Sequence, residues 1–348
     1  MADVRVEWQA LQRFTAGVFE RLGMPAADAA LEAEVLVWAN LRGVDSHGVQ
    51  RVAEYTRRVD DGGMNPRPEI RIVRETPAAL LIEANHAFGP VVTVFAVGQV
   101  VARARALGVA WALIRNTTHQ GAIGYYTERI ARQGLAGIAV VCNPPNMAPP
   151  GARAPGVHNS PISIAVPGQA RPALTLDMAT SVAAGGKLQV AVDKGVPIPP
   201  DWALDGDGRP TTDPQQAVSL QPAGGYKGYG LALMFECLTS LMVANPLLLP
   251  SLTGQGVRPG TQNGFVAALD IAFFTDLDGY RASVDQVVAA LKGLPLAAGA
   301  GEVLVPGEPE ERVCAERLRD GIPLPPGTVD KLRAAAARFG LSLPPGLE

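Results

Sequence analysis

The sequence predicts an α+β protein with helices at both ends of the chain and a sheet in the middle. Residues 1–60 carry apolar side chains at helical spacing, the middle alternates short β-like runs with helical stretches, and the C-terminal part returns to helical spacing. The length of 348 residues predicts about two domains. The 47% of hydrophobic residues are enough for a large core. We predict a helical domain over 1–75, joined by C-terminal helices within 280–348, and an α/β domain over 76–279.

Three helices are predicted in the N-terminal part. Apolar residues recur at helical spacing over Leu11–Leu22, Leu31–Trp38 and Val49–Val59. Gly43 is a suitable stop for the second helix. The segment Asp45–Gly48 is therefore expected in the turn before the third helix or at its start.

The middle of the chain alternates strands and helices. Strands are expected at Ala79–Ala84, Val109–Ile114, Leu135–Cys142, Ile162–Val166, Ala173–Asp177 and Gly264–Phe274. Helices are expected over Pro90–Gly108, from the His119 loop to about Gln133, and over Lys227–Met242. The loop Asn143–Asn159 is rich in proline and glycine and too long for a simple connector, which indicates a functional role.

The C-terminal part is expected to be helical near Val284–Leu291, Pro309–Leu318 and Thr328–Phe339. Thr328 has the side chain of a good N-cap residue.

Composition narrows the class of protein. The net charge is −3 and no basic stripe is present, which argues against nucleic acid as a partner. The apolar stretches are too short or too interrupted to span a membrane. Three cysteines without close spacing indicate reduced thiols rather than disulfides or a metal site, and the charged N-terminus indicates no signal peptide. We therefore expect a cytoplasmic protein without a structural metal.

The common nucleotide-binding motifs are missing. The segment Gly254–Gly260 has the wrong spacing for a dinucleotide fingerprint, and Pro259 stands where a helix should open. No phosphate-binding P-loop occurs, and Asp205–Gly208 lacks the ligands of a calcium loop. A bound nucleotide would need another device.

Ser46 and His47 form the first candidate site. Histidine is the side chain whose unperturbed charge changes near neutral pH, and this chain has only four. Arg51 lies four residues after His47, hence on the same face of a helix, so a proton donor and a carboxylate clamp can stand side by side. The alternative is a helix-capping serine beside a solvated histidine.

Three further residues occupy suggestive positions. His119 lies in a loop between a strand and a helix, where glycine-lined NH groups bind phosphate well. Asp177 ends an apolar strand, where a carboxylate can orient a histidine. Lys227 follows two glycines at the head of an apolar helix, which suits an anionic ligand. The alternatives are an ordinary loop histidine, a helix N-cap and a surface lysine.

The segments around His47, His119, Asp177 and Lys227, taken in this order, resemble the malate/L-lactate dehydrogenase family of the non-Rossmann type. The resemblance covers nearly the whole chain, from the N-terminal helices to Val303–Glu308. The resemblance implies a mixed-sheet domain that binds NAD or NADP without a glycine fingerprint. It implies hydride transfer between the nicotinamide and C2 of a small 2-hydroxy or 2-oxo acid. It also implies a homodimer with active sites shared between subunits.

The resemblance also implies roles for single residues. Ser46 and His47 match the pair that gives or takes the substrate proton, Asp177 matches a carboxylate that assists it, and Arg51 matches a ligand of the substrate carboxylate. His119 matches a histidine beside the nicotinamide that some members are thought to use as the base, so the choice between His47 and His119 stays open. The positions that match cofactor-binding residues are His119, Gly121, Asn143, Asp177, Met178, Ala179, Lys227, Gly307 and Glu308.

One departure from the family concerns substrate choice. Many members have Gly-Thr-Asn-Pro where this chain has His158–Pro161. An imidazole there could add a hydrogen-bond donor to the pocket. Reduction of a cyclic imino acid or a diketo sugar acid is an alternative activity. A hydrolase using Ser46, His47 and Asp177 and an inactive nucleotide-binding protein are alternatives from other classes.

Overall fold

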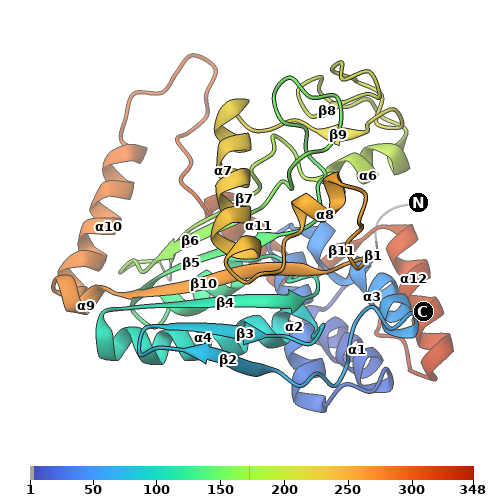
Figure 1. The fold of residues 1–348 in the computed structure, drawn as a ribbon, viewed down its shortest axis with the longest axis horizontal. Coiled ribbons are helices and arrows are strands. Elements are labelled where there is room, and N and C mark those ends of the chain that lie inside the picture. The colour runs from blue at the N-terminus through green and yellow to red at the C-terminus, as the bar shows by residue number, and fades with distance from the viewer. Residues whose placement is uncertain (1–3, 172) are drawn as a thin grey trace.

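A mixed sheet of seven strands forms the centre of the computed structural model, which describes residues 4–171 and 173–348 (Figure 1). The strand order is β2-β3-β4-β10-β5-β6-β7. Strands β3 and β4 are parallel, and the other five neighbouring pairs are antiparallel. The strands are β2 (Arg71–Glu75), β3 (Ala79–Glu83), β4 (Val109–Thr117), β5 (Leu135–Cys142), β6 (Ile162–Val166), β7 (Leu174–Met178) and β10 (Gln262–Asp270).

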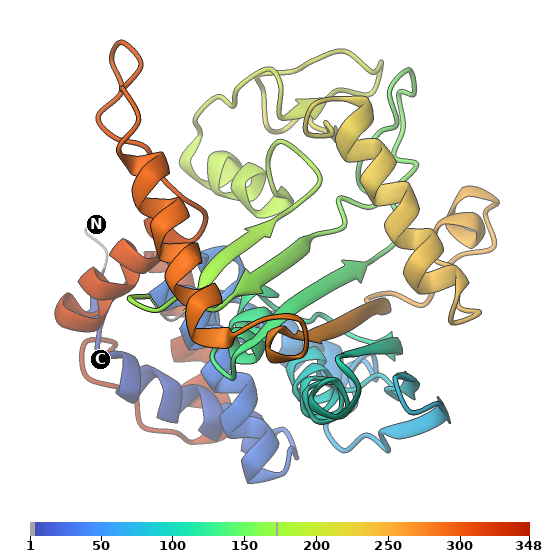
Figure 2. The ribbon, with the colours of Figure 1, turned by 90° about the vertical axis from the view of Figure 1, so that its left-hand side faces the viewer.

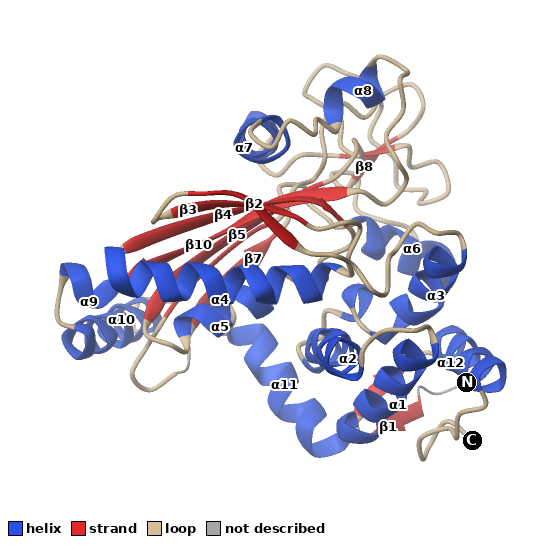
Figure 3. Ribbon diagram, turned by 60° about the horizontal axis from the view of Figure 1, so that its bottom comes forward, coloured by secondary structure: helices blue, strands red, loops and turns tan. Residues whose placement is uncertain are grey.

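Helices cover both faces of this sheet (Figure 3). Helices α4 (Gly89–Leu107) and α5 (Gly124–Ala131) pack on one face, where they share a core with β3, β4 and β5. On the other face, Phe235 of α7 (Tyr226–Glu236) packs against β4, β5 and β10. The central strands are buried on both sides, which explains their continuous apolar runs.

Helix α4 needs a separate comment because it is long and apolar. Its 19 residues meet the length and composition of a membrane span, so the prediction that every apolar stretch is too short or too interrupted is wrong for this helix. In the fold one side of the helix, including Val92, Ala96 and Val100, lies in the core against the sheet, while Phe95 and Leu107 are exposed.

The N-terminal helices and the C-terminal end of the chain share a second core. Strand β1 (Val4–Val6) pairs with β11 (Ile322–Leu324), and α12 (Pro326–Phe339) packs on α1 (Trp8–Arg21) and α3 (Val52–Asp60). Helix α2 (Ala26–Leu41) lies between this core and α4, and α11 (Glu308–Asp320) contacts α2. The contacts favour the predicted joining of the two ends, while the exact domain boundaries stay a prediction.

Three predicted elements differ from the structure. The strand predicted at Gly264–Phe274 ends at Asp270, whose side chain accepts a hydrogen bond from Ala272 N and caps α9 (Ile271–Phe274). Thr328 is not an N-cap, because α12 already begins at Pro326. The helix predicted over Lys227–Met242 is α7 followed by a π-helical turn, and most of its apolar stripe is exposed.

Several elements lack a clear sequence pattern. Helix α6 (Gly185–Lys194) begins with two glycines, and β1, β8 (Ala203–Leu204), β9 (Ser219–Leu220) and β11 are two or three residues long. Helix α8 spans Leu248–Leu252. Helix α10 (Leu277–Lys292) begins earlier than predicted, and Figure 2 shows that it and the loop after it extend away from the sheet.

Candidate active site

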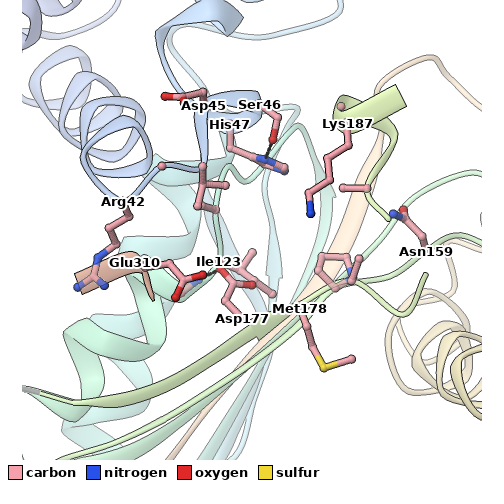
Figure 4. Close-up of a pocket in the computed structure, with 18 of the residues that line it drawn as sticks. Arg42, Asp45, Ser46, His47, Ile123, Asn159, Asp177, Met178, Lys187 and Glu310 are labelled. Atoms are coloured by element: carbon pink, nitrogen blue, oxygen red, sulfur yellow. Dashed lines mark hydrogen bonds between the residues drawn. The ribbon is translucent and has the colours of Figure 1, made fainter. Parts of the chain in front are cut away.

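A cavity of about 970 Å³ lies where the helical part meets the sheet, and it collects most of the predicted residues. The predicted residues that line it are Ser46, His47, His119, Gly121, Asn143, Asp177, Met178, Ala179 and Gly307. In Figure 4, Ser46 and His47 enter from the helical part, Asp177 and Met178 come from β7, and Lys187 enters from α6. Segments far apart in the sequence therefore form one site.

The turn that carries His47 is held by buried hydrogen bonds. Asn40 donates from Nδ2 to Asp45 at 2.6 Å and accepts from Val49 N at 2.8 Å. Arg317 of α11 binds both carboxylate oxygens of Asp45, at 2.6 and 3.0 Å. A Cβ on Gly48 would lie 2.2 Å from Asn40 Oδ1, so only glycine fits this position. The C-terminal part thus fixes the N-terminal histidine.

We predict that Asn40→Ala destabilises the protein by about 1–3 kcal/mol, because the buried Val49 N–H loses its partner, while Asp45 keeps its hydrogen bonds to Arg317. Chemical denaturation measures the free energy of unfolding. The exposed residue Gln215 offers a control, since Gln215→Ala should change stability by less than about 0.5 kcal/mol. Equal stability of Asn40→Ala and wild type would contradict this account of the turn.

His47 contacts Ser46 and stacks on His119. Its Nδ1 lies 2.9 Å from Ser46 Oγ, and the two imidazole rings are 5.2 Å apart with an interplanar angle of 27°. Burial, with a smaller contribution from the Arg51 charge, lowers the pKa of His47 to about 4. His47 is therefore neutral at physiological pH and has a ring nitrogen that can accept a proton.

His119 is held in one tautomer by its neighbours. The Tyr55 hydroxyl lies 2.5 Å from His119 Nδ1, and Gly121 N donates to the same nitrogen at 3.3 Å. Nδ1 accepts from the Gly121 N–H, so we assign the proton of the neutral ring to Nε2. Burial, followed by the charge of Arg51, lowers the pKa of His119 well below its usual value. His119 therefore offers an N–H donor rather than a base.

Asp177 lines the cavity but binds elsewhere than predicted. Its Oδ2 accepts from Gly124 N, at the start of α5, at 2.7 Å. The hydrogen bonds of the described residues join Asp177 neither to His47 nor to Ser46, so the chain does not assemble a hydrolase triad here. Surrounding protein desolvates the carboxyl and raises the pKa of Asp177 to about 6, although its side chain is accessible from the cavity.

Three predicted residues lie outside the lining of the cavity. Arg51 donates to the Ser46 carbonyl at 2.7 Å and to Glu54 at 2.7 Å. Glu308 accepts from Lys292 at 2.6 Å. Lys227 is exposed in the first turn of α7. Their roles in binding stay predictions.

The cavity also contains functional candidates that the sequence analysis missed. Lys187 extends toward the space between His47 and Met178, and Arg42 lies at the far side beside Glu310 (Figure 4). Two glycines precede Lys187, and two glycines also stand just before Tyr226 and Lys227. The pattern that made Lys227 a candidate therefore also marks Lys187. Tyr55 was seen only as one residue of an apolar helical stripe.

Glycines make room in the cavity wall. A Cβ on Gly124 would lie 2.9 Å from Asp177 Oδ2, and one on Gly186 would lie 2.6 Å from Ser46 Cβ. Arg42 is paired with Glu128 at 2.8 Å, so Lys187 is the cation of this wall that best suits the phosphate of a long ligand. Within residues 4–171 and 173–348, no group of three or more His, Cys, Asp or Glu is placed to hold a metal ion.

A family model, curated relatives and solved structures all place this chain in the same family. The family model described as malate/L-lactate dehydrogenase matches residues 6–333. L-sulfolactate dehydrogenase of Methanocaldococcus jannaschii is 35% identical over 328 residues, 94% of each chain. The solved structure of sulfolactate dehydrogenase from that organism has a TM-score of 0.87 at 33% identity and covers 97% of this chain and 98% of its own.

Two further relatives differ in the cofactor that their names carry. Ureidoglycolate dehydrogenase (NAD(+)) of Escherichia coli O157:H7 is 33% identical over 302 residues, 86% of each chain. A (2R)-3-sulfolactate dehydrogenase (NADP(+)) of Chromohalobacter salexigens is 32% identical over 322 residues, 91% of this chain and 93% of its own.

Proposed function

Because this chain belongs to the malate/L-lactate dehydrogenase family, it is an NAD(P)-dependent oxidoreductase, and we propose that it interconverts a small 2-hydroxy acid and the corresponding 2-oxo acid. The observation that carries the proposal is the pair of stacked, neutral histidines, His47 and His119, in a cavity of about 970 Å³. The pair supplies both a proton acceptor and a hydrogen-bond donor at one point.

The cavity residues fit a nicotinamide dinucleotide. We propose that Gly121, Asn143, Met178 and Ala179 line the cofactor, that Lys187 faces its phosphates, and that Gly307 lies at the adenosine end. The cofactor, when bound, supplies or accepts the hydride at its nicotinamide C4. The chain itself positions the substrate, excludes water and moves the hydroxyl proton.

The hydrogen bonds divide the work between the two histidines. In the oxidation direction, the neutral His47 takes the proton of the C2 hydroxyl, and Ser46 orients its ring through Nδ1. His119 donates its Nε2–H to the same substrate oxygen and stabilises negative charge there. In the reduction direction His47 returns the proton.

A panel assay tests the proposal. Purified protein is incubated with reduced NAD or NADP and with paired 2-oxo acids and cyclic imine carboxylates, and cofactor absorbance is followed. We expect turnover of at least one 2-oxo acid. Turnover confined to the imines would instead support the imino-acid alternative, in which C=N replaces C=O.

Arg51 provides a prediction about substrate charge. Its guanidinium lies on the turn of His47 and could exchange its partner Glu54 for the substrate carboxylate. Arg51→Lys loses the planar fork, so we expect a raised KM and a kcat/KM lower by about tenfold or more toward 2-oxo acids. Arg57→Lys, on the exposed face of α3, is the control. Unchanged kinetics in Arg51→Lys would remove Arg51 from the site.

The pH profile should separate His47 from Asp177. With a pKa of about 4, His47 stays deprotonated through neutral pH, so oxidation should not decline near 6.5, the ordinary histidine pKa. An inflection in kcat/KM near pH 6 would come from Asp177 and should vanish in Asp177→Asn. An inflection near 6.5 that survives in Asp177→Asn would contradict the assignment.

We also propose a cytoplasmic homodimer with shared sites. Helix α7 and the turn after it expose a group of large apolar side chains, namely Tyr226, Leu231, Met234, Leu238, Leu241 and Met242. Exposed apolar side chains grouped in this way support an interface with another protein surface. The symmetric homodimer is the commonest assembly of soluble proteins. Lys227 lies in the first turn of the same helix, so burial of α7 in an interface would bring Lys227 to the partner. The three unpaired cysteines suit a reducing compartment.

A further inference from the structure

His158 is a third histidine in the cavity, and the proposed proton transfer does not use it. Its neighbour Asn159 is fixed on several sides, with Asn146 bound at 2.8 and 2.9 Å and Ser181 at 3.1 Å. The backbone next to His158 is therefore held firmly at the end of a long loop. His158 lines the same cavity as His119.

The hydrogen bonds around His158 indicate which of its ring nitrogens carries the proton. Ser160 Oγ donates to Cys142 Sγ at 3.3 Å, and Nδ1 of His158 lies 3.3 Å from the same oxygen. With its proton directed to the sulfur, Ser160 accepts from Nδ1–H, which leaves a lone pair on Nε2. Among the residues that the structure describes, Nε2 forms no hydrogen bond. Burial lowers the pKa of His158 to about 3, so the ring is neutral.

We propose that His158 is a specificity residue that accepts a hydrogen bond from the substrate and selects 2-oxo acids with an O–H or N–H donor on C3. This inference rests on the proposed function. A carbonyl placed between His47 and His119 directs the rest of the substrate into the cavity that His158 lines. There, the Nε2 lone pair attracts a donor, is left without a partner by a methyl group, and repels a second carboxylate. The sequence analysis expected His158 to offer the substrate a hydrogen-bond donor, whereas this inference makes its Nε2 an acceptor.

The test compares two substrates of nearly equal shape. Hydroxypyruvate has a hydroxyl group where 2-oxobutanoate has a methyl group. We expect wild type to prefer hydroxypyruvate by about tenfold or more in kcat/KM, because the buried acceptor loses its partner with the methyl compound. His158→Phe should abolish most of this preference, and His158→Gln, whose amide oxygen can replace Nε2, should retain part of it.

A second measurement does not depend on activity. Long-range ¹H–¹⁵N spectra of the wild-type protein report the tautomer of each histidine. We expect the proton of His158 on Nδ1, and a proton on Nε2 would overturn the inference. An equal preference in wild type and His158→Phe would also overturn it, provided that 2-oxo acids are turned over. Failure of wild type to reduce any 2-oxo acid would instead refute the proposed function, and the tautomer would still decide the assignment of His158.

Discussion

His47→Ala is expected to lower kcat by about 10²–10⁴-fold, the usual contribution of a general acid or base. The variant removes the ring that stacks on His119 and contacts Ser46 Oγ at 2.9 Å. The remaining histidine cannot replace it, because Tyr55 and Gly121 hold the proton of His119 on Nε2. Steady-state kinetics give kcat, and cofactor titration should show nearly unchanged affinity.

His86→Asn is the matched control for this variant. His86 lies outside the cavity and has a φ of 54°, a conformation that asparagine tolerates, so activity should stay near wild type. If His119→Ala abolishes turnover while His47→Ala retains it, the two histidines have the opposite roles.

Mixing two inactive variants is expected to restore activity. We expect His47→Ala and Lys227→Ala each to be severely impaired as homodimers, because Lys227 is exposed on its own chain and is proposed to serve the partner's site. Random reassortment makes half of the dimers hybrid with one intact site each, so about a quarter of wild-type activity should return. Activity after refolding or subunit exchange measures this.

A second mixture serves as the control for the first. His47 and His119 stack within one chain, so hybrids of His47→Ala and His119→Ala should keep a defect in both sites and stay inactive. A fully active monomer in light scattering would refute the dimer. Proven hybrids of the first pair without activity would refute only the sharing of these two residues.

The sequence predicts the fold best where periodicity is strong and local. The stripe Leu11–Leu22 lies in α1 and its C-cap, and the buried runs of β4 and β5 are continuous because both faces of the sheet are covered. Prediction fails where a single side chain changes the conformation, as Asp270 does when its cap turns an apolar strand into a helix. Helix α6 begins Gly-Gly, which favours a loop by intrinsic propensity.

The site follows a similar division. Sequence motifs bring attention to His47, His119 and Asp177, and all three line one cavity. The contact that fixes the tautomer of His119 is not visible in the sequence, because Tyr55 and His119 are 64 positions apart. The binding of Asp177 to Gly124 N likewise depends on the packing of β7 against α5.

The transfer of deuterium from reduced cofactor labelled at C4 tests the central claim most directly. The account predicts that wild type incubated with this cofactor and a 2-oxo acid forms a 2-hydroxy acid with deuterium on C2, detected by mass spectrometry and proton NMR. Cofactor labelled on the two faces of the ring in separate reactions ensures that either stereochemistry is detected. A 2-hydroxy acid without deuterium from either label, or no product with any 2-oxo acid, would contradict the account.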